Sequence, residues 1–253
     1  TWYHEQGING SIPFRGPIAA NTVAGTISGW GAAFALSKKS LGGRLPLSRL
    51  LEDAIHYAEN GVPVTHSQSA LTEKKRAELT PQPGFADTFL VNGKAPATGS
   101  VFLQKRLAAT LRQITKKGTE DYYRGELAEQ IAKELKQIGS PLRLDDLQRH
   151  QAKLINPLHL AHSVADVYNM TPPTQGVVSL MILGILDQLK LKQFVVDSPE
   201  YVHHCVEATK QAFKVRDQYI TDPAYMQQHA QEFLSPAFLK TLAEKVNSSK
   251  ALP

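Results

Sequence analysis

The most apolar stretch of the chain runs from residue 176 to residue 188 and shows no polar face. The hydrophobic positions after Gly176 are Val177, Val178, Leu180, Met181, Ile182, Leu183, Ile185 and Leu186. A helix that is apolar on every side is buried on every side. It follows Pro172-Pro173, a pair that cannot extend a sheet ladder or lie deep within a helix. The pattern predicts a central buried helix, with a rigid turn that holds Gln175 and Gly176 at its N-terminal end.

Elsewhere, hydrophobic residues recur at three- and four-residue spacing, which predicts amphipathic helices with one buried face. The predicted helices cover residues 26–39, 48–60, 103–117, 120–138 and 144–147, and two more follow residues 198 and 235. Side chains that favour helix N-termini precede four of them, namely Ser48, Thr119, Ser198 and Ser235. Glycines that favour helix C-termini follow three of them, namely Gly61, Gly118 and Gly139.

Each predicted helix has an inner face that the spacing of its apolar residues defines. For residues 103–117 it consists of Leu107, Leu111 and Ile114, and for residues 120–138 of Leu127, Ile131, Leu135 and Ile138. After residue 198 the expected inner face is Val202, Cys205, Val206, Thr209 and Phe213. After residue 235 it is Phe238, Leu239, Leu242 and Val246, and the tail at 247–250 loses its pattern and is expected to fray.

Strands are scarce in the pattern. Alternation over residues 158–168 predicts one strand or a hairpin, whereas residues 1–25 are irregular. Residues 62–100 carry several Pro and Gly residues, which favours helix fragments and loops. The chain is therefore helix-rich with few strands. It is either an α-rich domain or a partner whose sheet is completed by another chain.

Composition narrows the class of protein. A hydrophobic share of 42% and a charged share of 20% are ordinary for a soluble globular chain of 253 residues. The formal charge of +5 does not come from a concentrated basic patch. The longest basic run, residues 74–76, is flanked by Glu73 and Glu78, so we expect no nucleic-acid partner. The apolar stretch is far shorter than the ~20 residues that span a bilayer, so we expect no membrane partner. The chain opens without Met, which indicates a piece of a longer protein.

Candidate chemistry is sparse. His159 and His162 would point to opposite faces of a strand, and His203 and His204 diverge on a helix, so we expect no metal. The single cysteine, Cys205, is expected to be a small buried hydrophobe, and Asp222-Pro223 a structural turn. In the stiff Pro13–Pro17 loop, Arg15 can either clamp a carboxylate ligand or form a salt bridge within the protein. No nucleophile emerges from these residues.

Five blocks resemble one known family. Residues 21–30, Asn-Thr-Val-Ala-Gly-Thr-Ile-Ser-Gly-Trp, are similar to its xVPGTVxGW segment. Residues 172–177, Pro-Pro-Thr-Gln-Gly-Val, are similar to its PPPSQGV turn, and residues 207–223 to its EAxKxAFxxRDxYxxDP signature. Blocks within residues 43–64 and 104–147 lie between them in the family's order. The chain thus resembles the large chain of the γ-glutamyltransferase superfamily of N-terminal-nucleophile hydrolases.

The resemblance implies an α+β fold, an αββα sandwich that a second chain completes. Residues 1–253 would form a single domain, the large-chain portion of a self-cleaved precursor whose N-terminal part is missing. The small chain of that precursor would begin with Thr, whose hydroxyl is the nucleophile and whose α-amine, with a pKa of ~7.7–8.0, is the base. This chain would then hold no catalytic residue, and no cofactor or metal is implied.

Residues 13–22 and Gln175 resemble the hydrolase branch of the family more than the transferases. The expected substrate is a small anionic amide, oxamate, cleaved to oxalate and ammonia in purine catabolism in the cytoplasm. We expect Arg15, Gln175 and Gly176 to bind substrate. The arginine that binds the substrate carboxylate in the transferases is absent, because its motif lies upstream of residue 1. The alternatives are a periplasmic or secreted γ-glutamyltransferase or glutathione hydrolase, a cephalosporin acylase, and a non-catalytic helical binding module.

Overall fold

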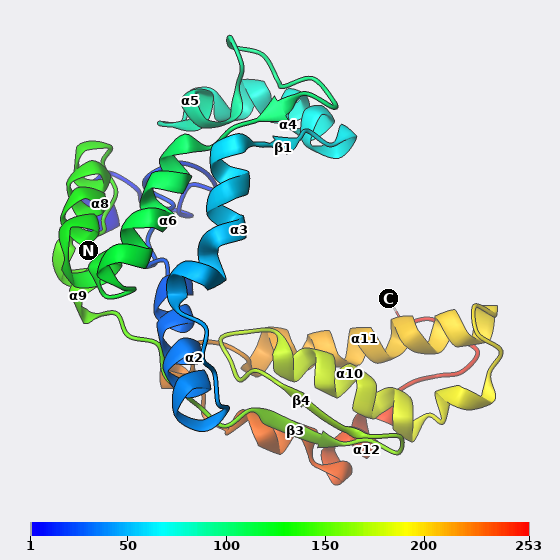
Figure 1. Cartoon of the computed structure of the whole chain (residues 1–253). Coiled ribbons are helices and arrows are strands. Elements are labelled where there is room, and N and C mark those ends of the chain that lie inside the picture. Colours follow the sequence, from blue (N-terminus) through cyan, green and yellow to red (C-terminus); the bar gives the residue numbers. More distant parts are fainter. Residues whose placement is uncertain (1, 253) are drawn as a thin grey trace. The chain divides into compact units, whose positions relative to one another are not determined.

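The computed structural model describes residues 2–252 and divides the chain into two compact units (Figure 1). Unit 1 comprises residues 1–154, and unit 2 comprises residues 155–253. One hydrophobic cluster lies in unit 2, and two smaller clusters lie in unit 1. That residues 1–253 act as a single domain stays a prediction.

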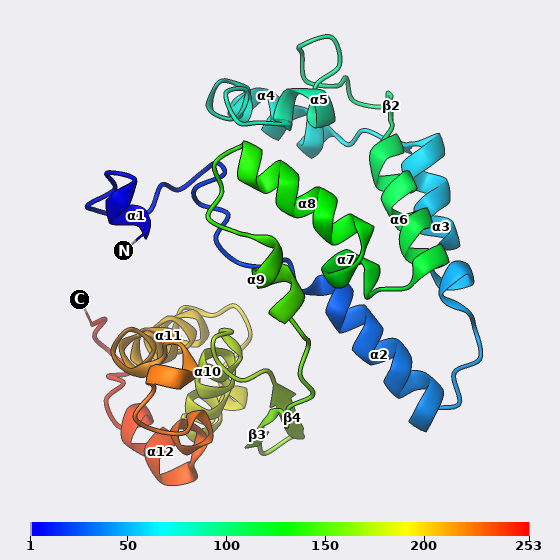
Figure 2. The same ribbon diagram turned by 90° about the vertical axis from the view of Figure 1, so that its left-hand side faces the viewer.

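The regular secondary structure of unit 1 is almost entirely helical. Its elements are α1 (Trp2–Glu5), α2 (Thr26–Ser40), α3 (Leu47–Asn60), β1 (Val62–Pro63), α4 (His66–Leu79), α5 (Phe85–Phe89), β2 (Val101–Phe102), α6 (Lys105–Lys117), α7 (Asp121–Arg124), α8 (Glu126–Gln137) and α9 (Leu144–Arg149). Helices α3 and α6 lie side by side in both views (Figures 1 and 2), and each ends at a glycine with positive φ, Gly61 at 92° and Gly118 at 88°. A left-handed φ is costly for other residues, which explains why both predicted stops are confirmed.

The core of unit 1 is divided into two small clusters. One contains Leu51, Ile114 and Leu127, and the other contains Ala128, Ala132 and Leu147. The hydroxyls of two buried residues, Tyr123 and Ser140, form hydrogen bonds with backbone groups of residues 20–28. Unit 1 therefore depends on polar contacts between distant segments as well as on burial.

Three details of unit 1 differ from the prediction. Helix α3 is preceded by Pro46, so Ser48 lies inside the helix and is not its cap. Leu107, which was predicted to be buried, is 45% exposed, and Ala108 lies in the core beside Leu111 instead. Residues 62–100 include α4, a helix of 14 residues, where only fragments were expected. The cause is a threonine cap, because Thr65 Oγ1 accepts a hydrogen bond from Gln68 N at 3.1 Å.

The helix predicted at 120–138 is interrupted, and Thr119 does not cap it. Glu120 is the residue before α7, and Gly125 separates α7 from α8. The buried Asp121 explains the break, because its carboxylate accepts hydrogen bonds from Glu126 N at 3.1 Å and from Gln113 Nε2 at 2.8 Å. At the far end Ile138, which the sequence placed on the inner face, is 41% exposed, so that part of the prediction is wrong.

Unit 2 begins with the predicted hairpin and continues with helices. Its elements are β3 (Leu158–Ala161), β4 (Asp166–Asn169), α10 (Gly176–Gln188), η1 (Leu191–Gln193), α11 (Pro199–Tyr219), η2 (Pro223–Tyr225), η3 (Ala230–Leu234) and α12 (Pro236–Ala243). The strands pair antiparallel, with Leu158 opposite Asn169 and Ala161 opposite Asp166. Both predicted Ser-Pro helix starts are confirmed in position, although only Ser198 makes the side-chain cap, to Tyr201 N at 3.2 Å.

Helix α10 is the centre of unit 2, as its apolar sequence predicts. It packs against α11, α12, η3 and the hairpin (Figure 1), and Val177, Met181 and Ile185 are fully buried. Burial is nevertheless incomplete, because Ser179 and Leu183 lie on an exposed side. The prediction of a helix covered on every side is therefore wrong for this one strip.

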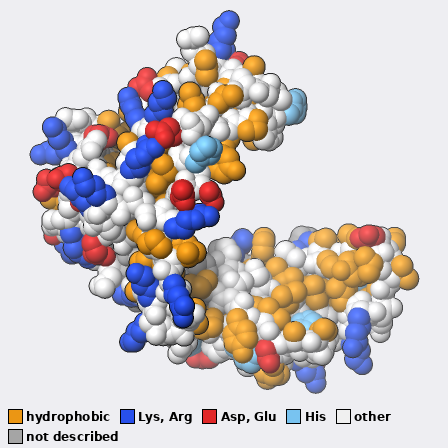
Figure 3. Space-filling view, viewed as in Figure 1, with side chains coloured by type: hydrophobic (Ala, Val, Ile, Leu, Met, Phe, Trp, Pro, Cys, Tyr) orange, Lys and Arg blue, Asp and Glu red, His pale blue; other side chains and the backbone are white. Residues whose placement is uncertain are grey.

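Helix α11 turns the opposite face inward from the one predicted. The buried residues are two alanines, one valine and three polar residues, namely Ala208, Ala212, Val215, His204, Glu207 and Gln211. The predicted inner face is largely exposed, with Val202 at 48%, Val206 at 46% and Phe213 at 39%. Alanines allow α11 to approach α10 closely, and this close packing decides which face is buried. Hydrophobic side chains therefore gather on the surface over α10 and α11 (Figure 3).

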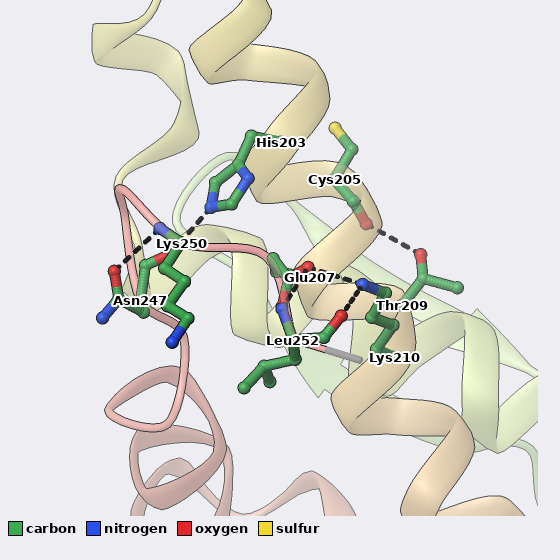
Figure 4. Close-up of polar contacts among 8 residues, drawn as sticks. All are labelled: His203, Cys205, Glu207, Thr209, Lys210, Asn247, Lys250 and Leu252. Carbon is green, nitrogen blue, oxygen red and sulfur yellow. Dashed lines mark hydrogen bonds and ion pairs between the residues drawn. The ribbon is translucent and has the colours of Figure 1, made fainter.

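The segment after α12 is ordered, although its sequence predicted fraying. Asn247 Oδ1 accepts hydrogen bonds from the backbone N–H groups of Ser249, at 2.9 Å, and Lys250, at 3.0 Å. Next, the backbone of Leu252 is hydrogen-bonded to side chains of α11 (Figure 4). Polar contacts thus replace the missing apolar pattern.

Candidate functional site

The turn before α10 holds two of the predicted site residues, Gln175 and Gly176. Thr174 Oγ1 donates to Thr171 O at 3.0 Å and accepts from Gly176 N at 3.2 Å, so one hydroxyl fastens the turn. Gly176 is buried, and a Cβ there would lie 2.1 Å from Met170 O. Only glycine fits without displacing the end of β4, which keeps the turn close to the strand.

Gln175 is exposed at the first position before α10, and among the described residues its side chain makes no capping hydrogen bond. An amide in this setting can donate and accept hydrogen bonds with a ligand without first breaking a contact within the protein. The rigid turn fixes its backbone. Gln175 thus exposes its side-chain amide, and Gly176 belongs to the rigid turn that holds it.

Arg15 belongs to unit 1 and already has a carboxylate partner. Its Nε donates to Glu78 Oε1 at 2.8 Å, and its guanidinium lies 4.7 Å from the centre of the Phe14 ring. Hydrogen bonds from Lys75 and Arg15 hold the pKa of the Glu78 carboxyl below its usual value. Of the two alternatives that the sequence leaves open for Arg15, the salt bridge is the one present here. Its role in substrate binding stays a prediction.

A polar cluster that the sequence did not single out links the hairpin turn to the end of α10. Asp187 Oδ2 accepts from Ser163 N at 2.9 Å, and Oδ1 accepts from the Ser163 hydroxyl. His162 Nε2 lies 3.8 Å from Asp187 Oδ1. Burial opposes ionisation of Asp187, but the hydrogen bonds from Ser163 and the nearby His162 outweigh it and lower the pKa.

The Asp187 cluster borders a cavity of about 560 Å³ that Leu183, Leu186 and Tyr201 also line. Serine, histidine and aspartate together raise the question of nucleophilic catalysis. That reaction needs the hydroxyl to donate to the histidine, whereas the hydroxyl of Ser163 donates to Asp187. The cluster therefore fixes the hairpin turn to α10 and does not supply a nucleophile.

Two further histidines of unit 2, His159 and His204, have structural partners. His159 Nε2 lies 2.6 Å from Asp166 Oδ1, and its ring stacks on Tyr168. His204 is buried, bonds to Glu200 O at 2.7 Å and stacks on Phe194. Within residues 2–252, no group of three His, Cys, Asp or Glu residues has the arrangement of a metal site.

Cys205 is half-buried on the outer face of α11, where the sequence predicted a buried residue. With Val206 and Phe213 it lines a shallow cavity of about 510 Å³. The guanidinium of Arg216 covers the neighbouring Phe213 ring at 3.8 Å, and Asp222 Oδ1 caps η2 through Ala224 N at 2.9 Å. The Asp222-Pro223 turn thus has the structural role that was expected.

Unit 1 has its own apolar groove, of about 460 Å³, between α2 and the start of α3. Trp30, Phe34 and Leu50 line it, with Lys38 and Arg44 among the neighbouring side chains. The Lys38 ammonium lies 4.5 Å from the Phe34 ring centre. Among residues 2–252, no serine, threonine or cysteine side chain is hydrogen-bonded to a histidine that could act as its base.

The family model of γ-glutamyltranspeptidase matches residues 2–253. The chain belongs to the γ-glutamyltranspeptidase family. The resemblance inferred from the five sequence blocks is thereby confirmed. Within this family, the Pro-Pro turn and the α11 signature are parts of one continuous match and not isolated motifs.

Two relatives in the γ-glutamyltranspeptidase family define the chain's neighbourhood. It is 49% identical over 242 residues to an oxamate amidohydrolase proenzyme of Klebsiella pneumoniae, a match that covers 96% of this chain and 46% of that protein. It is 38% identical over 236 residues to a glutathione hydrolase-like proenzyme, YwrD, of Bacillus subtilis, with 93% and 44% covered. The chain thus spans about half the length of these relatives.

A solved structure supports the same assignment. The crystal structure of Helicobacter pylori γ-glutamyltranspeptidase is similar with a TM-score of 0.86 and 26% identity, over 96% of this chain and 68% of that one. The predicted α+β class agrees with this neighbour, and the chain itself is helix-rich with few strands. Across residues 2–252, every helix is either too short or too polar to cross a membrane.

Proposed function

We propose that this chain is the large chain of a heterodimeric N-terminal-threonine amidohydrolase that acts on a small anionic amide, oxamate. The observation that carries the proposal is the 49% identity with an oxamate amidohydrolase proenzyme over 96% of the chain. The glutathione hydrolase-like relative is matched over a similar span with 38% identity. The higher identity with the oxamate amidohydrolase proenzyme favours oxamate hydrolysis over glutathione hydrolysis.

In the proposed reaction the nucleophile belongs to the second chain of the same precursor. Its N-terminal Thr hydroxyl attacks the oxamate amide carbon, the α-amine takes the proton, and ammonia leaves from the tetrahedral intermediate. Water then hydrolyses the acyl-enzyme, so one oxamate and one water give one oxalate and one ammonia. A free α-amine has a pKa of ~7.7–8.0 and is partly neutral near pH 7, which is why the precursor must be cut first.

The second chain also accounts for the sparse sheets. The strands of this chain form only two-stranded pairs within residues 2–252, β1 with β2 and β3 with β4, and an isolated pair of strands is at best marginally stable. The outer faces of α2 and α11 expose large apolar residues, which typically lie at interfaces. An αββα sandwich completed by the small chain would cover such surfaces.

Gln175 is the residue of this chain that we assign to substrate. Its exposed amide can donate a hydrogen bond to the carboxylate of an anionic amide, and Gly176 keeps its support rigid. Arg15 would contribute only by exchanging Glu78 for the substrate carboxylate. The work of the large chain would be to wall the pocket and hold carboxylate-binding donors.

A glutathione hydrolase or γ-glutamyltransferase is the second candidate, and the name of the Bacillus subtilis relative favours it. The two candidates differ in the amide bond that they cleave, which is the oxamate amide in the first and a γ-glutamyl bond in the second. An exported enzyme would suit the transferase, whereas a cytoplasmic one in purine catabolism would suit oxamate hydrolysis.

One assay separates the candidates. Ammonia release from oxamate is compared with p-nitroaniline release from a γ-glutamyl anilide, with the same enzyme preparation. We expect faster turnover of oxamate, and faster turnover of the anilide would transfer the assignment to the second candidate. Cephalosporin acylase activity and a non-catalytic helical module remain alternatives, and mass spectrometry of a second chain that begins with Thr would eliminate the module.

A further inference from the structure

Helix α11 carries a buried carboxylate whose partners include the backbone of a segment more than 40 residues away. Glu207 is 1% exposed. Its carboxylate forms an ion pair with Lys210, whose Nζ lies 2.9 Å from Glu207 Oε1. Residues three apart on a helix lie on one face, so the pair presents its charges together. A buried charge is costly unless its hydrogen bonds are satisfied.

Both residues of this pair contact the same residue of the ordered segment after α12 (Figure 4). The two carboxylate oxygens of Glu207 accept from Leu252 N at 3.3 Å, and Lys210 Nζ donates to Leu252 O at 2.5 Å. The acceptor meets the N–H and the donor meets the carbonyl, so the pair binds the main chain of Leu252 in a fixed direction. The leucine side chain takes no part in these contacts.

A second attachment begins the segment. His203 bonds to Asn247 O at 2.7 Å, one turn before Glu207 on α11 (Figure 4). Between the two attachments, Asn247 Oδ1 closes a turn through the N–H groups of Ser249 and Lys250. The path from α12 to residue 252 is therefore set by polar contacts along one helix.

We propose that Glu207 and Lys210 form a clamp on the main chain at Leu252, and that this clamp positions the polypeptide beyond it for cleavage of the precursor. The inference rests on the proposed function, because it concerns the uncut precursor of the two-chain enzyme. Glu207 and Lys210 are positioning residues and touch no reacting atom. Both belong to the signature block at residues 207–223, for which no role follows from substrate binding.

The protonation state of the clamp suits this role. The hydrogen bond from Lys210 holds the pKa of the Glu207 carboxyl below its usual value, and Leu252 N acts in the same direction against the effect of burial. The carboxylate is then charged whenever the precursor is at neutral pH. It can accept hydrogen bonds continuously and cannot compete as a donor for the carbonyl of Leu252.

The test follows self-cleavage of the freshly purified full-length precursor on denaturing gels, with thermal unfolding of each uncut protein as a second measurement. Glu207→Gln and Lys210→Met should slow cleavage about tenfold or more, the effect of losing a hydrogen bond to a charged group. Glu200→Gln and Lys214→Met make the same changes at exposed positions of α11 and should cleave at the wild-type rate.

Two further comparisons separate a clamp from a general loss of stability. Leu252→Pro removes the N–H group that donates to the Glu207 carboxylate and should slow cleavage. Leu252→Ala keeps this N–H group and should leave the cleavage rate unchanged. The exchange Glu207→Lys with Lys210→Glu retains an ion pair but places an ammonium against Leu252 N, so it should restore the melting temperature more than the cleavage rate. Cleavage of the exchanged protein at the wild-type rate overturns the clamp.

The outcomes also separate this inference from the proposed function. If the wild-type precursor is cut and Glu207→Gln is cut equally fast, the clamp is wrong and the proposed function stands. If the wild-type precursor does not cut itself, the proposed function fails, and the clamp fails with it. Slow cleavage in Glu207→Gln and Leu252→Pro, with normal rates in both α11 controls, supports both.

Discussion

Helices α10 and α2 are both rich in apolar residues but have very different surroundings. Helix α10 buries seven of its residues, among them Val177, Met181 and Ile185. Helix α2 buries only Ser28, and its Trp30 and Leu36 are more than a third exposed. Apolar content therefore predicts that a helix forms, but it does not predict how much of that helix its own chain covers.

The difference extends to the way each unit is held together. Unit 2 has one continuous core around α10, whereas unit 1 has small clusters joined by hydroxyl groups. Tyr123 Oη donates to Ala24 O at 2.7 Å and accepts from Ser28 N at 2.9 Å, and Ser140 Oγ donates to Ala20 O at 3.0 Å. Unit 2 is stabilised mainly by burial and unit 1 largely by specific polar contacts.

The strongest test of this contrast removes a large side chain from the core of unit 2. Phe233 is 2% exposed and packs against Tyr219 and Phe238, so Phe233→Ala should lower the free energy of unfolding by about 3–5 kcal/mol. Leu183→Ala, at a residue 39% exposed, is the control and should cost less than about 1 kcal/mol.

Urea unfolding followed by circular dichroism and by tryptophan fluorescence reports this change. Both tryptophans, Trp2 and Trp30, lie in unit 1, so fluorescence follows unit 1 alone. A shift by both signals shows that the units unfold together, and a shift in circular dichroism alone shows that they unfold separately. Equal effects of Phe233→Ala and Leu183→Ala would refute the single core.

The matching test in unit 1 removes one hydroxyl. Tyr123→Phe leaves the buried Ser28 N–H and the Ala24 C=O without their hydrogen-bond partner, which should cost about 1–3 kcal/mol. Faster hydrogen exchange at the Ser28 amide would report the loss directly. Tyr57→Phe, at a tyrosine 57% exposed, should change neither measurement. An unchanged Ser28 amide in Tyr123→Phe would show that the hydroxyl does not hold the segment.

A smaller effect should appear in acid. The pKa of Glu207 is lowered from 4.5, chiefly by the hydrogen bond from Lys210, so its contribution is present above that value and is lost as the pH falls through the folded-state pKa. The stability difference between wild type and Glu207→Gln should therefore shrink below pH 4.5. Thermal unfolding across that range measures it, with Glu200→Gln as the matched control. A constant difference would contradict the assignment.

The smallest effects are expected on the exposed apolar faces. Val206→Ser on α11 and Leu36→Ser on α2 should each change the stability of this chain by less than about 0.5 kcal/mol, because both residues are well exposed. Val178→Ser, at a residue 3% exposed, serves as the buried control and should be clearly destabilising. A large effect at residue 206 would show that α11 is oriented as the sequence predicted.

Much of the secondary structure could be predicted because local signals specify it. The apolar run of α10, the glycines at 61 and 118 and the Ser198 cap all act within a few residues of where they occur. The inner face of α11 could not be predicted this way. Its orientation depends on the close approach that Ala208 and Ala212 allow, and periodicity weights large residues above small ones.

The polar interactions were the least predictable part. The break at Gly125 depends on Asp121, and the ordered tail depends on Glu207, more than 40 residues away. The candidate site shares this limit. The Pro-Pro turn with Gln175 and Gly176 could be found from the sequence, but the partner of Arg15, Glu78, lies 63 residues further along. Such pairings depend on tertiary structure, which no local window contains.

The hydroxyl contacts of residues 20–28 also have a consequence for synthesis on the ribosome. Ser28 Oγ accepts from Ala152 N, a residue 124 positions later in the chain. At about 5–20 residues per second, the first segment waits roughly 6–25 s before its last partner has been made. During that interval the Ser28 hydroxyl lacks this partner, although Tyr123 and Ser140 are made earlier. The position of the Ser28 side chain is therefore fixed only after residue 152 has been made.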